Sequence, residues 1–488
     1  MNPWERLERL GAAIRAPAAT AAERQWRWLK RCLRRNASTR YGKRHGFSEV
    51  RSAADYQRRV PLAAYDELRR DIRRIHRGES DVLFSGKAAA FEWTGGSAAG
   101  KKLIPYSRNS FDDIRRSALP WLGRLIRTHR LRRGTVYWAL SPVHREGRTD
   151  RVGVAEEDYL GPAAARCLRA LSAVSMDTTA DPGKWERETL SQLIHRSDLA
   201  LVSLWSPTFL LALLEALDRH TADLLRTFPG HAGLRRYLRT GRTSELWPHL
   251  KVISCWTEGS SHRYYREIKT RFPHSVVQPK GLALTEGVVT FPDERDRLRL
   301  ALDSGFFEFL DGRGVPRFAG ELSRGGRYEL VLTTSGGLYR YRTGDRVRCQ
   351  GHVAGEPILS FEGRGGVCGD LAGEKLTEDF VSRCLKPLRG FAMLTQNPSP
   401  APGYDLVIDA RLTTRLGRAA IESRLRRNPQ YRYARRLNQL RPLSVVPLSD
   451  PEDLYRRHAG RRGQSLGDIK FPALCLDPGW WKAEAPRP

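Results

Sequence analysis

The sequence predicts an α/β protein with a large N-terminal domain of layered sheets and helices and a smaller α+β C-terminal domain. Its 488 residues are 40% hydrophobic, enough for a large core and for roughly two to four structural units. From residue 91 onward, short apolar runs alternate with helical patterns. Such alternation is typical of strands that helices cover on both faces.

The elements follow from the spacing of the apolar side chains. In the first hundred residues these side chains recur at helical spacing, which predicts charged amphipathic helices. Interior strands are predicted at residues 136–140, 199–205 and 251–256, which are continuous apolar runs. A helix is predicted at 207–219, with Ser206 as its N-terminal cap and a proline in its first turn.

The second half of the chain changes toward short strands and turns. Residues 328–334 and 338–342 are apolar runs separated by Ser-Gly-Gly, so they predict a hairpin. A Gly-Arg-Gly-Gly segment follows, and its glycines let backbone angles change freely. We therefore expect an N-terminal domain at 1–363 and a C-terminal domain at 364–488.

The chain is strongly basic, with 84 Lys and Arg against 54 Asp and Glu and a net charge of +30. The arginines are scattered and no nucleic-acid-binding signature accompanies them, so a nucleic-acid partner is disfavoured. Binding of an anionic substrate is enough to explain part of the positive charge. The seven cysteines form no Cys-x-x-Cys pair, which disfavours a disulfide framework or a zinc site. The N-terminus lacks a signal-peptide pattern, and the most apolar stretch, 199–214, is too interrupted for a membrane span. We expect a cytoplasmic protein.

A cluster of glycines and hydroxyl residues that ends in lysine lies at residues 94–102. Small residues let backbone N–H groups approach phosphates, hydroxyls add donors and lysine adds a positive charge. The spacing is neither that of a P-loop nor that of a dinucleotide-binding fingerprint. The cluster predicts a phosphate grip, with a plain turn as the alternative, and its candidate residues are Thr94, Gly95, Gly96, Ser97 and Lys102.

Three further segments carry side chains that suit a nucleotide. Thr285 and Glu286 place a hydroxyl beside a carboxylate, which suit an α-phosphate and a magnesium ion. Asp345 ends a hairpin strand, where its two acceptor oxygens suit ribose hydroxyls. Lys470 is one of the few lysines in an arginine-dominated chain. Taken singly, Thr285 with Glu286 favours a helix start, Asp345 a turn and Lys470 a surface lysine. Only the order of these residues along the chain discriminates between such local roles and a nucleotide site.

In that order the segments resemble the adenylate-forming superfamily of acyl-acid ligases. Within it the chain is most similar to the bacterial branch of the auxin-responsive promoter family of acyl-acid amido synthetases. The lines that carry the resemblance are KLIPY at 102–106, YRTGDRV at 341–347, FEGR at 361–364 and KFPALC at 470–475. The resemblance extends from about residue 41 to residue 475.

The resemblance implies an enzyme that uses ATP and Mg²⁺ to adenylate a small carboxylic acid and then passes the acyl group to an amine or amino acid. It implies that the C-terminal domain is a mobile lid that brings catalytic Lys470 to the acid and the α-phosphate. Glu286 would be the second catalytic residue and the metal ligand. The ATP-binding residues that it implies are Thr94, Gly95, Gly96, Ser97, Lys102, Thr285, Glu286, Tyr341, Asp345 and Arg364.

The phosphate loop departs from the family pattern. Gly95 stands where a serine is usual, Ala98 where a hydroxyl residue is usual and Ala99 where a glycine is usual, so two hydroxyl donors are missing. Leu282 replaces the aromatic residue that usually packs on adenine. The two carboxylates that the resemblance requires are retained, which favours an active enzyme over a homologue that binds nucleotide poorly.

The acid is expected near Trp205, Phe209 and Trp256, whose rings could form the walls of a pocket, although core packing explains them equally well. Two other functions stay open. A ligase that forms a thioester with coenzyme A or a carrier protein shares the first half-reaction, and no residue separates it from an amide-forming enzyme. A non-catalytic binding protein is the third possibility.

Overall fold

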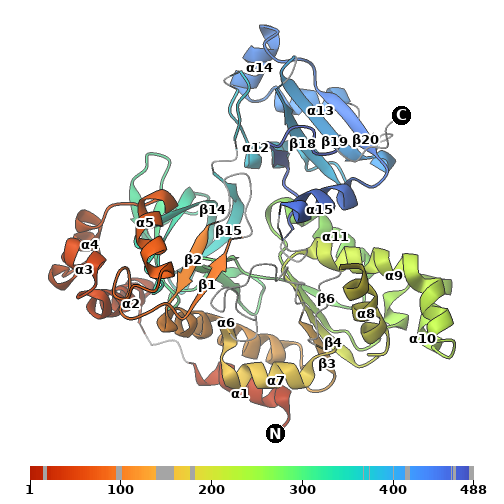
Figure 1. Cartoon of the computed structure of the whole chain (residues 1–488), viewed down its shortest axis with the longest axis horizontal. Coiled ribbons are helices and arrows are strands. Elements are labelled where there is room, and N and C mark those ends of the chain that lie inside the picture. Colours follow the sequence, from red (N-terminus) through yellow and green to blue (C-terminus); the bar gives the residue numbers. More distant parts are fainter. Residues whose placement is uncertain are drawn as a thin grey trace.

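The structure is a computed structural model that describes residues 1–14, 19–94, 102–138, 159–175, 182–365, 368–372, 374–398, 401–412, 418–462, 464 and 469–482. Figure 1 shows two lobes side by side and a third, smaller lobe that the C-terminal residues form above them. The predicted α/β class is therefore visible as layers of helices on several sheets.

The N-terminal segment is helical, as the spacing of its apolar side chains predicts. Its first two helices begin at capping boxes, in which Asn2 and Thr20 accept hydrogen bonds from the backbone N–H groups of Glu5 and Glu23. The helices are α1 Pro3–Ala13, α2 Ala21–Asn36, α3 Arg40–Arg44, α4 Ala53–Arg59 and α5 Tyr65–His76.

A four-stranded parallel sheet forms the centre of one lobe (Figure 1), within the described part of the chain. Its strands are, in spatial order, β3 Thr135–Trp138, β4 Leu199–Ser203, β5 Val252–Cys255 and β6 Val276–Pro279. One apolar cluster packs α8 to α11 on one face, and another packs α1, α6 and α7 on the other. The predicted interior strands and their cover on both faces are confirmed. The helices are α6 Arg108–Thr128, α7 Pro162–Leu171, α8 Pro182–Ile194, α9 Pro207–Thr227, α10 Ala232–Thr240 and α11 His262–Arg271.

Helix α9 corrects one local prediction. It is longer than expected, and Ser206 occupies its N-cap position without a side-chain hydrogen bond to the helix backbone. The Ser206 hydroxyl instead donates to the carbonyl oxygen of Ile469 at 3.2 Å, with Thr208 Oγ1 2.6 Å away. A distant segment therefore competes with the capping interaction, and sequence spacing near residue 206 could not reveal that.

A seven-stranded antiparallel sheet fills the other lobe, counted over the described residues. Its order is β12-β11-β13-β14-β15-β10-β9, and β13 pairs with β14 as the predicted hairpin, with Leu332 opposite Tyr341. Two small hairpins, β1 with β2 and β7 with β8, lie outside it. The strands are β1 Ala90–Trp93, β2 Leu103–Tyr106, β7 Ala283–Leu284, β8 Gly287–Val288, β9 Thr290–Pro292, β10 Leu298–Leu300, β11 Phe306–Leu310, β12 Pro316–Phe318, β13 Arg327–Thr333, β14 Tyr341–Val353 and β15 Glu356–Arg364.

The C-terminal lobe has its own sheet, in the order β20-β19-β18-β21. One face packs on α12, α13 and α14, and the other joins the apolar cluster of α9 and α11 through α15 and the residues around Phe471. The elements are β16 Cys368–Gly369, β17 Leu376–Thr377, α12 Glu378–Leu385, β18 Ala392–Asn397, β19 Gly403–Asp409, α13 Arg418–Leu425, α14 Pro429–Arg436, β20 Ser444–Leu448, α15 Pro451–Arg461 and β21 Leu474–Cys475.

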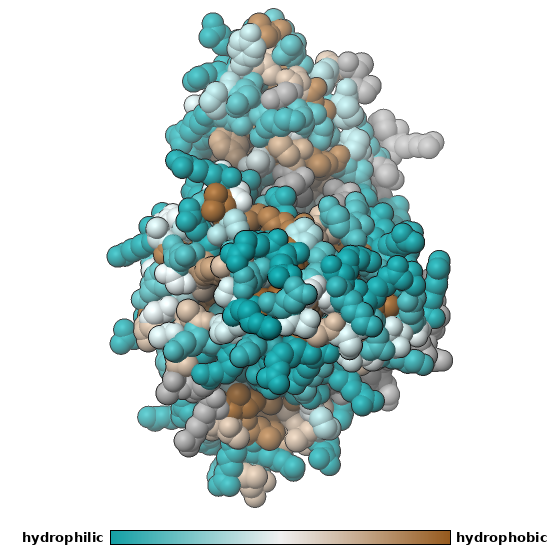
Figure 2. All heavy atoms as spheres, turned by 90° about the vertical axis from the view of Figure 1, so that its left-hand side faces the viewer, coloured by the Kyte–Doolittle hydropathy of each residue, from teal (hydrophilic) through white to brown (hydrophobic). Residues whose placement is uncertain are grey.

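The molecular surface accounts for part of the arginine excess. The face that bears α2 to α5 is mostly hydrophilic, with apolar side chains in small separate groups (Figure 2). On α5, Arg69 pairs with Asp66, and Arg74 pairs with Glu79 at 2.8 Å, which is typical of a solvated helix face. None of the helices in the described ranges combines the length and apolar character that a bilayer crossing requires.

Candidate active site

Tyr341, at the start of β14, lies at the centre of the candidate site and is fully buried. The residue before it fixes its position. Arg340 adopts a left-handed backbone conformation with φ of 44°, and its buried guanidinium pairs with Glu308 at 2.9 Å. Ala63 donates its N–H to the Arg340 carbonyl oxygen at 3.0 Å and accepts from the Arg342 N–H at 2.8 Å. The backbone on both sides of Tyr341 is therefore held by the segment between α4 and α5.

A hydrogen-bonded chain joins Lys102, Tyr341 and Glu286. The Lys102 ammonium nitrogen lies 3.1 Å from the Tyr341 hydroxyl oxygen, and that hydroxyl donates to Glu286 Oε1 at 3.3 Å. The Lys102 nitrogen also lies 5.8 Å from the centre of the Tyr65 ring. The two hydrogen bonds join residues 239 and 55 positions apart, and Glu286 is only 6% exposed. A cation and a carboxylate predicted from separate motifs thus meet on one hydroxyl group.

The hairpin of β1 and β2 positions Lys102 beside Tyr341. Thr94 closes the hairpin, because its backbone N–H donates to the Lys102 carbonyl oxygen at 2.9 Å and its Oγ1 accepts from the Lys102 N–H at 3.1 Å. Gly95, Gly96 and Ser97 lie outside the described residues. The structure therefore describes the two ends of the predicted phosphate loop, and its middle stays a prediction.

The turn between β7 and β8 presents Thr285 and the residue after it. The Tyr106 hydroxyl donates to the Thr285 carbonyl oxygen, which ties the turn to the end of β2. Upstream, a Cβ on Gly281 would lie 1.8 Å from the Thr290 carbonyl oxygen, so only glycine allows the two backbones to come this close. Leu282 donates its N–H to Thr290 Oγ1 at 2.8 Å and is buried in an apolar cluster that includes Trp256. The helix start considered for Thr285 is replaced by a hairpin turn.

Asp345 lies further along β14 on the buried side of the strand. Tyr341, Thr343 and Asp345 are buried, whereas Arg342 between them is exposed. The Asp345 N–H donates to Thr343 Oγ1 at 3.0 Å, and Asp345 pairs across the ladder with Arg364 at the end of β15. The backbone of Arg364 is thus beside Asp345, while its side chain lies outside what the structure describes.

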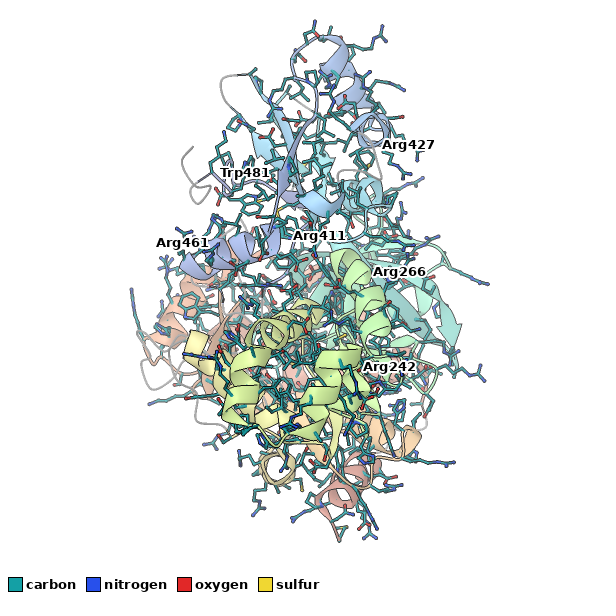
Figure 3. All side chains as sticks on the ribbon, turned by 90° about the vertical axis from the view of Figure 1, so that its right-hand side faces the viewer. Arg242, Arg266, Arg411, Arg427, Arg461 and Trp481 are labelled. Carbon is teal, nitrogen blue, oxygen red and sulfur yellow. The ribbon has the colours of Figure 1, made fainter. Side chains whose placement is uncertain are left out.

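Lys470 reaches the large N-terminal part of the chain from the C-terminal lobe. Its ammonium nitrogen lies 5.4 Å from the centre of the Trp256 ring. The residues on both sides of it, Ile469 and Phe471, are 1% and 2% exposed and belong to the apolar cluster of α9 and α11. Figure 3 shows α15 between those helices and the C-terminal sheet. The late lysine therefore lies at the junction of the lobes.

The carboxyl ends of the parallel strands gather most of the predicted acid-binding residues. Trp205 and Trp256 follow β4 and β5, and the Trp256 N–H donates to the Trp205 carbonyl oxygen at 2.9 Å. Phe209 does not join them. It is buried in the apolar cluster between α9 and the sheet, where it packs as a core residue. The sequence-based interpretation missed Lys280, whose nitrogen lies 4.4 Å from the Trp205 ring centre and 5.5 Å from that of Trp138. The sequence offered one signal for this residue, which is a lysine directly after an apolar strand.

Glu258 lies two residues after Trp256 and has a displaced pKa. Burial raises the pKa of this carboxyl group to about 7, and a hydrogen bond from the Phe361 N–H at 2.7 Å opposes part of that rise. The Phe361 ring also contacts Trp256, with ring centres 5.5 Å apart. A carboxyl group that titrates near neutral pH therefore links the β5 end to β15, the strand that leads into the C-terminal lobe.

Comparisons with known proteins identify the family. The GH3 family N-terminal domain matches residues 12–228, and the GH3 family central domain matches residues 298–364. A probable indole-3-acetic acid-amido synthetase of Oryza sativa subsp. japonica is 26% identical over 94% of this chain and 88% of its own length. The jasmonoyl-L-amino acid synthetase of Nicotiana attenuata is 30% identical over 25% of this chain and 23% of its own length.

Solved structures share the fold. The acyl acid amido synthetase AtGH3.15 in complex with 2,4-DB has a TM-score of 0.82 at 20% identity, over 99% of this chain and 96% of that chain. A 2-hydroxyisobutyryl-CoA ligase in complex with 2-HIB-AMP has a TM-score of 0.56 at 12% identity, over 99% and 90%. The predicted fold class and the predicted class of enzyme, an adenylate-forming amide ligase, are confirmed. The chain belongs to the GH3 family of acyl-acid amido synthetases.

Proposed function

We propose that this protein activates a small carboxylic acid with ATP and transfers the acyl group to an amine or amino acid. The observation that carries the proposal is the contact of Lys102 and Glu286 through the hydroxyl of Tyr341. A cation and a carboxylate from distant segments are what a magnesium-bound triphosphate requires of a site. The apposition of Lys470 and Trp256 adds a second cation at the junction of the lobes.

In the first half-reaction, the acid carboxylate attacks the α-phosphorus of ATP and pyrophosphate leaves. Negative charge develops on the phosphate oxygens, so cations held in place before the reaction stabilise the transition state more than the ground state. Lys102 and the loop that starts at Thr94 would bind the phosphates, and Thr285 would bind the α-phosphate. Asp345 would accept hydrogen bonds from the ribose hydroxyls, and Tyr341 and Arg364 would be further ATP-binding residues.

Glu286 fits the role of a magnesium ligand. It is a buried carboxylate beside the phosphate-binding lysine, and proteins commonly hold Mg²⁺ through one or two carboxylates plus substrate phosphates. The described residues contain no group of three or more His, Cys, Asp or Glu that could hold a metal without such a substrate. A magnesium ion bound there would neutralise part of the charge on the phosphates.

Lys470 would approach the acid carboxylate and the α-phosphate during adenylation and leave before the amine attacks. We place the boundary between the two domains at residues 363 and 364, where β15 ends. The two half-reactions need different groups around one phosphate, so rotation of residues 364–488 as a lid would exchange those groups.

The test is acid-dependent exchange of labelled pyrophosphate into ATP, screened over aromatic and aliphatic acids. Lys470→Ala should abolish exchange while ATP still binds. Lys375→Ala is the matched control, because Lys375 is an exposed lysine of the same lobe that pairs with Asp370, and it should leave exchange unchanged. Equal exchange by the two variants would contradict the role of Lys470.

The acceptor is tested separately. AMP release with an active acid is compared in the presence of amino acids, simple amines and coenzyme A. We expect an amide product with at least one amine. A product with the thiol alone would replace amide formation by thioester formation in this proposal.

A further inference from the structure

Five arginines line one depression along the outer side of α5, on the hydrophilic side of the molecule that Figure 2 shows. The depression has a volume of about 450 Å³, within the range of about 300 to 1,000 Å³ that is typical of small-molecule sites. The residues that line it are Asp66, Arg69, Arg70, Arg73, Arg74 and Arg77. All of them carry a charge, so the depression suits an ionic ligand rather than an apolar one.

Helix α5 carries this cluster on its outer side because its other side belongs to the core. The buried residues of α5 that join the apolar cluster of the N-terminal segment include Leu68, Ile72 and Ile75. At about 3.6 residues per turn, Arg70, Arg73 and Arg77 fall on the side opposite to them, and all three are exposed. The packing of the apolar side therefore fixes the helix that presents the arginines to solvent.

Only two of the five arginines are paired with carboxylates, Arg69 with Asp66 and Arg74 with Glu79. The side chains of the other three form no hydrogen bond or ion pair with any residue that the structure describes. Like charges three or four positions apart on a helix repel one another. The empty cluster therefore opposes the folding of α5, and a bound anion would remove that repulsion.

The cluster begins beside the lysine that we propose to bind the phosphates of ATP. The guanidinium carbon of Arg69 lies 5.5 Å from the centre of the Tyr65 ring, and the Lys102 nitrogen lies 5.8 Å from the same centre. The Tyr65 hydroxyl accepts from the Leu103 N–H at 2.9 Å, which ties the start of α5 to β2. One tyrosine thus joins the arginine cluster to the proposed phosphate site.

The arrangement indicates the chemistry of the ligand. A guanidinium group donates two parallel N–H bonds to a phosphate or a carboxylate, and several such groups around one small volume suit several oxyanions on a short chain. We propose that the depression on α5 is a second anion site, which binds a soluble polyphosphate such as pyrophosphate. The position beside Lys102 favours phosphate over a polycarboxylate, because the proposed first half-reaction brings ATP there and releases pyrophosphate. This choice of ligand class rests on the proposed function, whereas the presence of an anion site does not.

Calorimetric titration of inorganic pyrophosphate into the full chain tests the site. A triple variant with Arg70→Gln, Arg73→Gln and Arg77→Gln removes the three arginines that lack a partner and leaves both ion pairs. The wild type should bind pyrophosphate at one site that this variant lacks, or that it binds at least about tenfold more weakly. Citrate should bind the wild type at that site at least about tenfold more weakly than pyrophosphate does.

A second triple variant removes the same charge from another part of the molecule. Arg427, Arg432 and Arg436 are exposed, lie in or just before α14 of the C-terminal lobe, and form no ion pair through their side chains with the described residues. Their replacement by glutamine should leave the affinity for pyrophosphate within about twofold of the wild type. Circular dichroism melting shows whether each variant folds.

Equal binding of pyrophosphate by the wild type and the α5 variant would overturn the inference. An equal loss in both triple variants would do the same, because the effect would then be one of net charge, and equal affinity for citrate would overturn the ligand class. Cosedimentation with vesicles of phosphatidylcholine and phosphatidylglycerol separates a soluble ligand from a lipid headgroup. Vesicle binding that the α5 variant loses, with no difference in pyrophosphate binding, would replace the soluble ligand by a membrane surface. Failure of the proposed function looks different, since exchange would be absent with every acid while the titration still detects this site.

Discussion

Replacement of Tyr341 by phenylalanine tests the centre of the site with the loss of one oxygen atom. The Tyr341 hydroxyl lies 3.1 Å from the Lys102 nitrogen and 3.3 Å from Glu286 Oε1, and the side chain is fully buried. Hydrogen bonds to charged groups contribute about 1.5 to 3 kcal/mol each. Loss of one such contribution corresponds to a fall of about 10-fold to about 150-fold in kcat/KM for ATP in pyrophosphate exchange.

Tyr339→Phe is the matched control for this prediction. Tyr339 is equally buried, lies two residues earlier, and donates its hydroxyl to the Leu83 carbonyl oxygen at 2.6 Å, which carries no formal charge. Both variants should lower the melting temperature, because each loses the hydrogen bonding of a buried hydroxyl group. Only Tyr341→Phe should lose activity beyond that. If kcat/KM of Tyr341→Phe stays within about twofold of the wild type, or if the two variants lose equal activity, the assignment of Tyr341 is refuted.

Three further predictions concern the groups that position the site. Glu308→Gln leaves the buried Arg340 guanidinium without its charge partner, so it should lower the free energy of unfolding by about 3 to 5 kcal/mol, measured by urea denaturation, and a cost below about 1 kcal/mol would contradict this. Glu258 has a pKa of about 7 when folded and 4.5 as its ordinary value, so the folded state binds the extra proton and wild-type stability falls as pH rises between these values. Glu258→Gln should remove about 2 to 3 kcal/mol of that fall between pH 5 and pH 8, and the same pH dependence of the urea midpoint in both proteins would show that Glu258 titrates normally. Phe471→Ala should cost about 3 to 5 kcal/mol and loosen the junction, seen as faster proteolysis between the lobes, whereas Lys470→Ala should leave proteolysis unchanged.

Local patterns predicted most of the elements because each depends on neighbours in the sequence. The interior strands at β3, β4 and β5 and the hairpin of β13 with β14 follow from continuous apolar runs and a glycine turn. Ser206 shows the limit of such patterns. Its hydroxyl bonds to Ile469, 263 positions away, and no local rule anticipates that contact.

The same limit applies to the site. Motif order predicted Lys102, Glu286 and Lys470 as site residues, since each belongs to a recognisable line of residues. The contact of Lys102 and Glu286 with Tyr341, and the position of Lys470 over Trp256, depend on the packing of separate parts of the fold. Lys280 escaped notice because a lysine after a strand has the same sequence pattern whether it faces water or two indole rings.

The described lysines of the candidate site share one kind of environment. Lys102 lies over Tyr65, Lys280 over Trp205 and Lys470 over Trp256. An aromatic face attracts a cation without neutralising it as a carboxylate would, so the N–H donors keep their directionality for an anionic ligand. Several arginines elsewhere in the chain are paired with carboxylates, as Arg340 is with Glu308. In the proposed site, lysines that lie over aromatic rings would add positive potential that attracts anionic substrates, while part of the arginine excess forms ion pairs or lies on the solvated surface.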